Sequence, residues 1–147
     1  MLSWLRRSPI PLLWRNLSAQ IERPFASNVA VSYEELPIIH VNATYNNTVL
    51  TITDHAGSTL GWKSAGSEGF KNARRGTNFA GQQAAIAAAK RALDLGITQV
   101  RVKVKGLGPG RKSSVKGLEL GGLDVFSITD VTPVPHNGCR PRKVRRL

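Results

Sequence analysis

The residues of this sequence best suited to chemistry are cations grouped with glycine. Residues 106–114 read GLGPGRKSS, a glycine-rich stretch followed at once by Arg111, Lys112 and Ser113. Backbone N–H groups exposed at the start of a helix, beside cationic side chains, make a site for phosphate. The pattern is not a nucleotide P-loop, because the lysine of that motif directly follows a glycine and Lys112 follows Arg111. The loop alone leaves open a mononucleotide or a nucleic-acid backbone, and the net charge of +12 favours the backbone.

Cations are concentrated in the loop over 66–76, in a strand-like stretch over 98–112 and in the C-terminal tail over 131–147. The tail has no apolar periodicity, so it cannot offset the entropy of ordering itself and needs a polyanion to lie against. If about eight of these cations meet phosphates, the log–log salt slope of binding should be roughly −5 to −7. The cations are Lys71, Arg74, Arg75, Arg101, Lys103, Lys105, Arg111, Lys112, Arg140, Arg142, Lys143, Arg145 and Arg146.

Catalytic and metal-binding patterns are weak in comparison. The chain has nine acidic residues, and no two are spaced as a carboxylate pair for acid–base work. Asp54 and His55 are adjacent in a turn, where their side chains diverge. His136 and Cys139 have a chelating separation but lack further ligands nearby, so a polar turn in a basic tail is the simpler interpretation. The sequence therefore predicts neither an enzyme nor a metal or cofactor site.

Composition and length limit the classes of protein further. The 147 residues suggest one domain, with a core of Val, Ile, Leu and Ala because aromatic residues make up only 6%. So few aromatics favour shape and phosphate readout of folded RNA over stacking on single-stranded bases. Cys139 is the single cysteine, which excludes an internal disulfide. No apolar run is long enough to cross a bilayer, so we expect a soluble or peripheral protein.

The N-terminal segment differs from the rest of the chain. Residues 1–25 are basic, contain serine, have no acid before Glu22 and show an amphipathic stripe at Leu13, Leu17 and Ile21. This composition predicts a mitochondrial presequence, with cleavage after Phe25. The alternative is an uncleaved basic extension that touches nucleic acid. We expect a weakly ordered linker over 26–36.

Hydrophobic periodicity predicts strands over 38–43, 48–53, 59–64, 98–105 and 123–129, and helices over about 78–95 and 111–121. Thr77 is the expected N-cap of the first helix, and Gly96 its left-handed C-terminal cap. Phe79, Ile86 and Leu93 recur every seven residues and predict one apolar face of that helix. Alanines on the same helix should let it approach a sheet closely. The order βββαβαβ predicts a mixed sheet covered by helices.

A family resemblance is carried by five segments that follow one another along the chain: IHVNATYNNTVLTITD (39–54), GW (61–62), GF (69–70), VKGLGPGR (104–111) and ITDVTPVPHNGCRPRKVRRL (128–147). Together they resemble the universal small-subunit ribosomal protein family eleven, in its bacterial-type branch. The resemblance covers residues 37–147. With a presequence in front, the chain looks like a mitochondrial member.

The resemblance implies a ribonuclease H-like fold without catalysis. This would be a three-layer α/β/α arrangement around a five-stranded mixed sheet, in an α/β domain over 37–130, followed by a basic extended C-terminal tail. Strand two would be antiparallel to the other strands. No cofactor, membrane or small-molecule substrate is implied.

The implied function is that of a structural constituent of the mitochondrial small ribosomal subunit, located in the matrix. The chain would bind small-subunit rRNA in the platform, near the E-site and exit path of the mRNA, beside other platform ribosomal proteins, and support assembly and translation. Carried over by position, the rRNA contacts fall on Asn46, Asn47, Lys71, Asn72, Arg74, Arg75, Lys105, Gly108, Gly110, Arg111, Lys112, Ser113, His136, Asn137, Arg140, Arg142, Lys143, Arg145 and Arg146.

Some residues depart from the family pattern. Asn72 stands where Gly is more frequent, and Gly81, Gly117 and Gly121 should weaken the two helices by roughly 1 kcal/mol each relative to Ala. Two alternatives use the same residues differently. An extra-ribosomal nucleic-acid-binding protein or nuclease would need clustered carboxylates on its strands, which offer only Asp124. A peripheral membrane protein would use the basic N-terminus.

Overall fold

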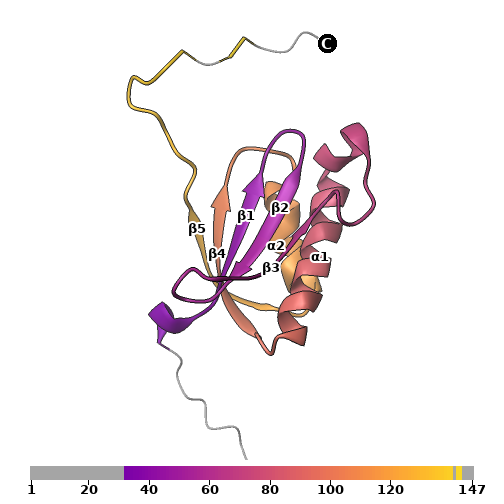
Figure 1. Cartoon of the computed structure of the whole chain (residues 1–147), viewed down its shortest axis with the longest axis vertical. Helices are drawn as coiled ribbons and strands as arrows, with labels where there is room; N and C mark the ends of the chain where they lie inside the picture. Colours follow the sequence, from indigo (N-terminus) through magenta and orange to yellow (C-terminus); the bar gives the residue numbers. More distant parts are fainter. Residues whose placement is uncertain (1–31, 141, 144–147) are drawn as a thin grey trace, which may run out of the picture. The chain divides into compact units, whose positions relative to one another are not determined.

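The five strands of this chain lie within one residue of the ranges that the sequence predicts. The computed structural model describes residues 32–140, 142 and 143 (Figure 1). The expected presequence over 1–25 lies outside the described residues, as do Arg145 and Arg146 of the tail. The helices and strands are β1 (Ile38–Ala43), β2 (Thr48–Thr53), β3 (Thr59–Ser64), α1 (Asn78–Asp94), β4 (Gln99–Lys105), α2 (Gly110–Leu120) and β5 (Asp124–Asp130), with short 3-10 turns η2 (Tyr33–Glu35) and η3 (Asn72–Gly76).

The five strands form one mixed sheet in the order β3-β2-β1-β4-β5. Strand β2 is antiparallel to both β1 and β3, while β4 is parallel to β1 and to β5. The expected five-stranded mixed sheet, with its second strand antiparallel to the others, is therefore confirmed.

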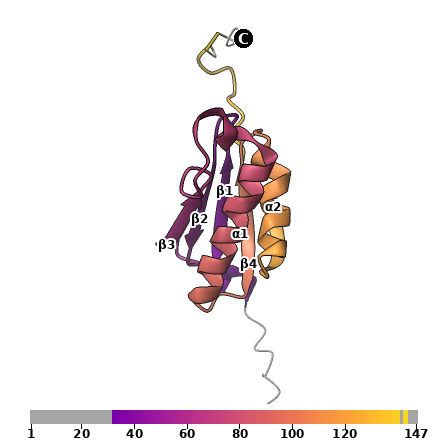
Figure 2. The same cartoon turned by 90° about the vertical axis from the view of Figure 1, so that its right-hand side faces the viewer.

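The expectation of three layers is wrong for the described residues. Helix α1 contacts β2 and β3, α2 contacts β1, β4 and β5, and the two helices contact each other. Figure 2 shows both on the same side of the sheet. The connections β3–α1–β4 and β4–α2–β5 step across the sheet in the same direction, and right-handed crossovers of that kind place both helices on one face. The described part of the chain is a two-layer α/β unit, with the other face of its sheet uncovered by a helix.

The core lies between the sheet and the helices. Val100, Val102 and Val104 alternate with the cations of β4, as the sequence predicts, and are buried beside Ile39, Val41, Leu50 and Ile52. The expected apolar stripe of α1 is wrong, because Phe79 is 60% exposed and Leu93 37% exposed. The buried face of α1 consists of Ala80, Gly81, Ala84, Ala85, Ala88, Ala89 and Ala92.

Small residues form this face because α1 and α2 lie very close together. A Cβ atom added to Gly117 would lie 2.6 Å from the carbonyl oxygen of Gln82 and 2.7 Å from the Cβ of Ala85. A Cβ on Gly121 would overlap the Cβ of Ala89. We call these residues, with Gly81, the small-residue seam. Glycines that weaken each helix in isolation here permit the contact between the helices.

The caps of α1 are those that the sequence predicts. The Thr77 hydroxyl accepts a hydrogen bond from the N–H of Ala80 at 3.2 Å. At the other end Gly96 has φ of +80°, and its N–H donates to the carbonyl of Leu93 at 2.9 Å. These caps fix where the helix begins and ends.

Residues 33–36 differ from the expected linker. Turn η2 packs on the sheet, and Leu36 is buried. The Arg101 guanidinium donates to the carbonyls of Glu34 and Leu36 at 3.0 and 3.1 Å, and its Cζ lies 4.9 Å from the centre of the Tyr33 ring.

Among the described helices, none combines the length and apolarity needed to cross a membrane.

Candidate nucleic-acid interface

Three strand ends, one turn, two helix starts and the tail meet at one end of the domain. Strands β1, β4 and β5 are parallel, so their carboxyl ends share one edge of the sheet, which we call the carboxyl edge. The β1–β2 turn lies at this edge, and both helices begin there, because each follows a loop on that side. The tail leaves the domain from the end of β5 at the same edge (Figure 1). Segments far apart in the sequence thus present their loops together.

The glycine loop before α2 is packed more tightly than a flexible phosphate cradle. A Cβ on Gly106 or Gly108 would overlap the carbonyls of Ala43 and Thr44. The N–H of Gly108 donates to the carbonyl of Ala43 at 2.9 Å, and that of Arg111 to the carbonyl of Gly108 at 3.1 Å. Gly108 and Gly110 are buried, so these glycines fix the start of α2 against the β1–β2 turn.

A groove of about 480 Å³ lies between the beginnings of the two helices. Asn78 contributes from the first turn of α1, and Lys112, Ser113 and Lys116 contribute from α2. The first N–H groups of a helix lack intrahelical partners and attract anions, and here two helices and two lysines face the same groove. The glycine loop, for which the sequence predicts a phosphate site, lines this groove together with Asn78 and Lys116, which the sequence motif did not reveal.

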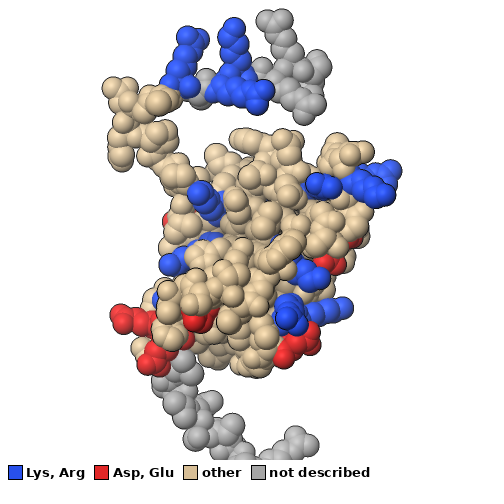
Figure 3. Space-filling view, in the orientation of Figure 1, with Lys and Arg blue, Asp and Glu red and all other residues tan. Residues whose placement is uncertain are grey.

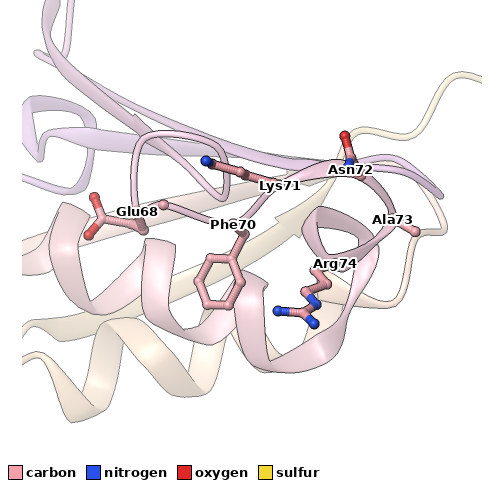
Figure 4. Close-up of a pocket in the computed structure, with 7 residues that line it drawn as sticks. Glu68, Phe70, Lys71, Asn72, Ala73 and Arg74 are labelled. Atoms are coloured by element: carbon pink, nitrogen blue, oxygen red, sulfur yellow. The ribbon is translucent and has the colours of Figure 1, made fainter.

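The loop before α1 forms a second basic surface (Figure 4). Residues 68–74 line a pocket of about 600 Å³. Asn72 adopts φ of +51°, a left-handed conformation that asparagine tolerates. This explains how asparagine can occupy a position where the pattern described above more often has glycine. Figure 4 shows the Phe70 ring and the Arg74 side chain on one side of the loop and Asn72 on the other.

The loop before α1 also lies against the β1–β2 turn. A Cβ on Gly76 would come within 2.6 Å of the carbonyl oxygen of Tyr45. In the turn, the Asn47 side chain accepts from the N–H of Thr48 at 3.0 Å, while Asn46 is exposed. The structure therefore brings the predicted contacts at Asn46 and Asn47 together with Lys71, Arg74 and Arg75.

Two predicted RNA-binding arginines are engaged inside the domain. The Arg75 Nε donates to the carbonyl of Phe70 at 3.0 Å. The Arg111 guanidinium donates to the Gly106 carbonyl at 2.9 Å and to the Asp130 carboxylate at 2.8 Å. Thr132 completes the network, its hydroxyl and N–H donating to Asp130 at 2.6 and 3.0 Å. Arg111 thereby ties the start of α2 to the point where the tail leaves β5.

This network makes a testable prediction about Asp130. The Arg111 guanidinium first, and Thr132 second, hold the pKa of Asp130 far below its ordinary value of 3.8. Replacing Arg111 with glutamine should raise this pKa toward that value. Because the carboxylate is the favoured form, the network stabilises the fold above about pH 3.8 and this contribution is lost as the pH falls further.

A carboxyl NMR titration of the full chain measures this pKa. Lys112→Gln removes a neighbouring exposed cation outside the network and should leave the pKa of Asp130 nearly unchanged. Equal shifts in the two variants would contradict the assignment of the network.

Charge is distributed unequally between the two ends of the domain. Most acids of the described residues lie at the end opposite the carboxyl edge, at the starts of β1 and β5 and the ends of β2 and both helices: Glu34, Glu35, Asp54, Asp94, Glu119 and Asp124. The other two, Glu68 and Asp130, form salt bridges with Lys63 and Arg111 at 3.1 and 2.8 Å. In Figure 3 the red side chains accordingly gather mainly away from the tail. The carboxyl edge thus presents cations without free carboxylates.

The tail extends this basic surface. Residues 133–140, 142 and 143 are exposed and form no helix or strand. Asn137 adopts φ of +49°, which turns the chain just before the cations Arg140, Arg142 and Lys143.

Among the described residues, no three His, Cys, Asp or Glu side chains gather as ligands for a metal ion.

Sequence comparison identifies the family. Residues 37–146 match the family described as Ribosomal protein S11. The chain belongs to this family. The match covers the α/β unit and the basic tail together, and it confirms the resemblance seen in the motifs.

Relatives in the S11 family include mitochondrial and bacterial proteins. The small ribosomal subunit protein uS11m of Mus musculus is 56% identical over 117 residues, covering 80% of this chain and 61% of that protein. Its counterpart in Bos taurus is 59% identical over 115 residues, covering 78% and 58%. The small ribosomal subunit protein uS11 of Solibacter usitatus is 53% identical over 110 residues, covering 75% and 82%. The matched region thus spans about three-fifths of the length of the mitochondrial relatives.

Most of the predicted site residues of this S11-family chain lie either at the carboxyl edge or on the tail. The exposed ones at the carboxyl edge are Asn46, Lys71, Asn72, Arg74, Arg75, Lys105 and Lys112; His136, Asn137, Arg140, Arg142 and Lys143 lie on the tail. Asn47 and Ser113 are half-buried, and the internal hydrogen bonds of Arg75 and Arg111 could not be read from charge patterning.

Proposed function

We propose that this chain is a structural protein of the small subunit of the mitochondrial ribosome, where it binds small-subunit rRNA and supports subunit assembly and translation. The observation that carries the proposal is the one-sided charge of the domain. Cations of two loops and the tail share the carboxyl edge, and the acids of the described residues are paired or lie at the other end. Such a surface suits closely spaced phosphates.

The contacts divide into two kinds. At the carboxyl edge, Lys71, Arg74, Lys105 and Lys112 contact phosphates of folded rRNA, and the groove between the helix starts takes one phosphate group. The tail then follows the rRNA away from the domain and neutralises phosphates with its five cations. Arg111 acts by setting the direction in which the tail leaves β5.

The finer location follows the family resemblance. The chain sits in the platform of the small subunit, near the E-site and exit path of the mRNA, beside other platform proteins. The strand order and the single antiparallel strand β2 support a ribonuclease H-like type of sheet. Membership of a ribosomal protein family also agrees with the expectation that the chain is not an enzyme.

Residues 1–25 act as the mitochondrial presequence, which directs the chain to the matrix. Support comes from their basic, acid-poor composition and from the two mitochondrial relatives. N-terminal sequencing of the mature protein should find Ala26 as its first residue. A mature protein that begins at Met1 would contradict cleavage at this point.

The nuclease alternative has little support from the sheet. Its strands carry two acids, Asp124 and Asp130, at opposite ends of β5. Six residue steps along the strand separate them by roughly 20 Å, too far for a shared metal ion. Asp130 is also held by Arg111 and Thr132.

Sedimentation tests the proposed function in cells of the source organism. The tagged chain should co-sediment with mitochondrial small subunits in sucrose gradients and leave them at high salt only when the subunit itself disassembles. Depletion of the chain should cause incomplete small subunits to accumulate. Free protein in the matrix, with normal assembly in its absence, would contradict the proposal.

A further inference from the structure

The face of the sheet opposite the helices carries its own set of polar and aromatic residues. Strand register places Trp62, Thr51, His40 and Lys103 in one row across β3, β2, β1 and β4. A second row, nearer the carboxyl edge, contains Val49, Asn42 and Lys105. We call this surface the open face. Two-layer packing leaves it without a covering α-helix in the described part of the chain (Figure 2), while turn η2 contacts it at Arg101.

The open face is cationic without a matching anion. Lys103 is half-buried, and neither it nor Lys105 forms a salt bridge among residues 32–140, 142 and 143. Arg101, the third cation of β4, already donates hydrogen bonds to the carbonyls of Glu34 and Leu36. Burial, and then the charge of Lys103, lower the pKa of His40 below its ordinary 6.5, so its imidazole is neutral at neutral pH.

An aromatic side chain completes the set. Trp62 is 61% exposed on the same row. Three strand spacings separate it from Lys103, roughly 14 Å, which is too far for one mononucleotide and suits a strand of several nucleotides. Sheet surfaces with exposed aromatics bind single-stranded RNA by stacking its bases, while nearby cations and amides contact the backbone and base edges.

The open face is continuous with the carboxyl edge. Asn42 and Lys105 also line a pocket of about 310 Å³ with Tyr45, Leu107 and Pro133, between the β1–β2 turn and the start of the tail. An RNA strand that meets Lys105 at the edge can therefore continue onto the row of Lys103 and Trp62. A polyanion is favoured over an apolar partner because two lysines without carboxylate partners face this path.

We propose that the open face is a platform for single-stranded RNA, on which a base stacks against Trp62 and phosphates bind Lys103 and Lys105. This inference rests on the proposed rRNA-binding function and adds a second surface to it. The low aromatic content argued against stacking as the main mode of recognition. The platform adds a single stacking position to a surface that is otherwise electrostatic.

Binding of octauridylate by the full chain tests the platform. NMR signals of the Trp62 indole, His40 and Lys103 should shift on binding, with the indole assigned by comparison with Trp62→Phe. Trp62→Ala and Lys103→Gln should each weaken binding by about three- to tenfold, because base–aromatic stacking and a phosphate contact are lost. Lys90→Gln removes the same charge from α1, on the helical face, and should have little effect.

Two results would overturn the platform while leaving the proposed function intact: shifts confined to the carboxyl edge and the tail, or unchanged octauridylate affinity in Trp62→Ala. Failure of the chain to bind any RNA, including small-subunit rRNA, would contradict the proposed function as well. A Trp62→Ala chain that still binds duplex RNA normally shows that the fold and the basic surface are intact.

Ultraviolet crosslinking of intact small subunits distinguishes the source of the strand. A Trp62 peptide joined to a nucleotide is expected, and sequencing of the attached RNA assigns it to rRNA or to mRNA. A Trp62 peptide found without RNA, while chemical crosslinks join Lys103 to an acidic protein segment, would overturn the proposal in favour of a protein partner.

Discussion

Replacing Arg142 and Lys143 with glutamine should lower the affinity of the full chain for mitochondrial small-subunit rRNA by about tenfold at moderate salt. Each lost phosphate contact removes about 0.7–0.9 from the log–log salt slope, so two contacts reduce it by roughly 1.5. Both residues are exposed on the tail, and the melting temperature should not change. Filter binding over a series of KCl concentrations gives the slope and the affinity together.

The matched control is the pair Lys90→Gln and Arg91→Gln, which removes one lysine and one arginine from the last turns of α1. Those residues lie on the helix toward its acidic end, so the control should keep the affinity and slope of the unaltered chain. Equal losses in both pairs would mean that net charge alone matters. A lower melting temperature in the tail variant would mean that the tail packs on the domain.

Replacing Gly117 with alanine should destabilise the folded chain by about 1–2 kcal/mol, although alanine is the better helix former by about 1 kcal/mol. The added Cβ would meet the Gln82 carbonyl oxygen at 2.6 Å, and a backbone atom in a packed helix cannot move aside cheaply. Overpacking of this kind costs roughly 1–3 kcal/mol or more. The melting temperature should fall by about 4–8 °C.

Glu119→Ala provides the control for Gly117→Ala, because Glu119 is exposed on the same helix and its replacement should change stability by less than about 0.5 kcal/mol. An increase in the stability of Gly117→Ala would show that helix propensity outweighs the contact at the small-residue seam. Calorimetry or thermal unfolding followed by circular dichroism measures both variants.

Local patterns predicted the strands, most clearly where apolar and polar side chains alternate, as in β4. Val100, Val102 and Val104 face the core while the cations between them do not, and no long-range information is needed to see this. Helix α1 shows the limit of such patterns. Phe79 and Leu93 have the spacing of a core stripe, yet the close approach of α2 requires alanines and glycine instead. The number of layers could not be predicted from local patterns, because it depends on the direction in which two crossover connections run across the sheet.

The basic surface was predictable in outline from the clustering of cations in loops and tail. The roles of individual arginines were not, because their partners come from distant segments. Arg111 donates hydrogen bonds to Gly106, Asp130 and Thr132, the last two about twenty residues away in sequence. No local sequence pattern predicts that network. Trp62 and Lys103 were also separated in sequence and meet on one face only through the register of four strands.

Lysine footprinting tests the central claim most directly. The free chain and intact mitochondrial small subunits are acetylated briefly, and the modified lysines are counted by mass spectrometry. Lys71, Lys105, Lys112 and Lys143 should be protected in the subunit and become reactive after ribonuclease digestion, while Lys90 should react more strongly in both states. Protection of Lys90 with the other four still reactive, or protection of those four that survives removal of the RNA, would contradict binding of rRNA through the carboxyl edge and the tail.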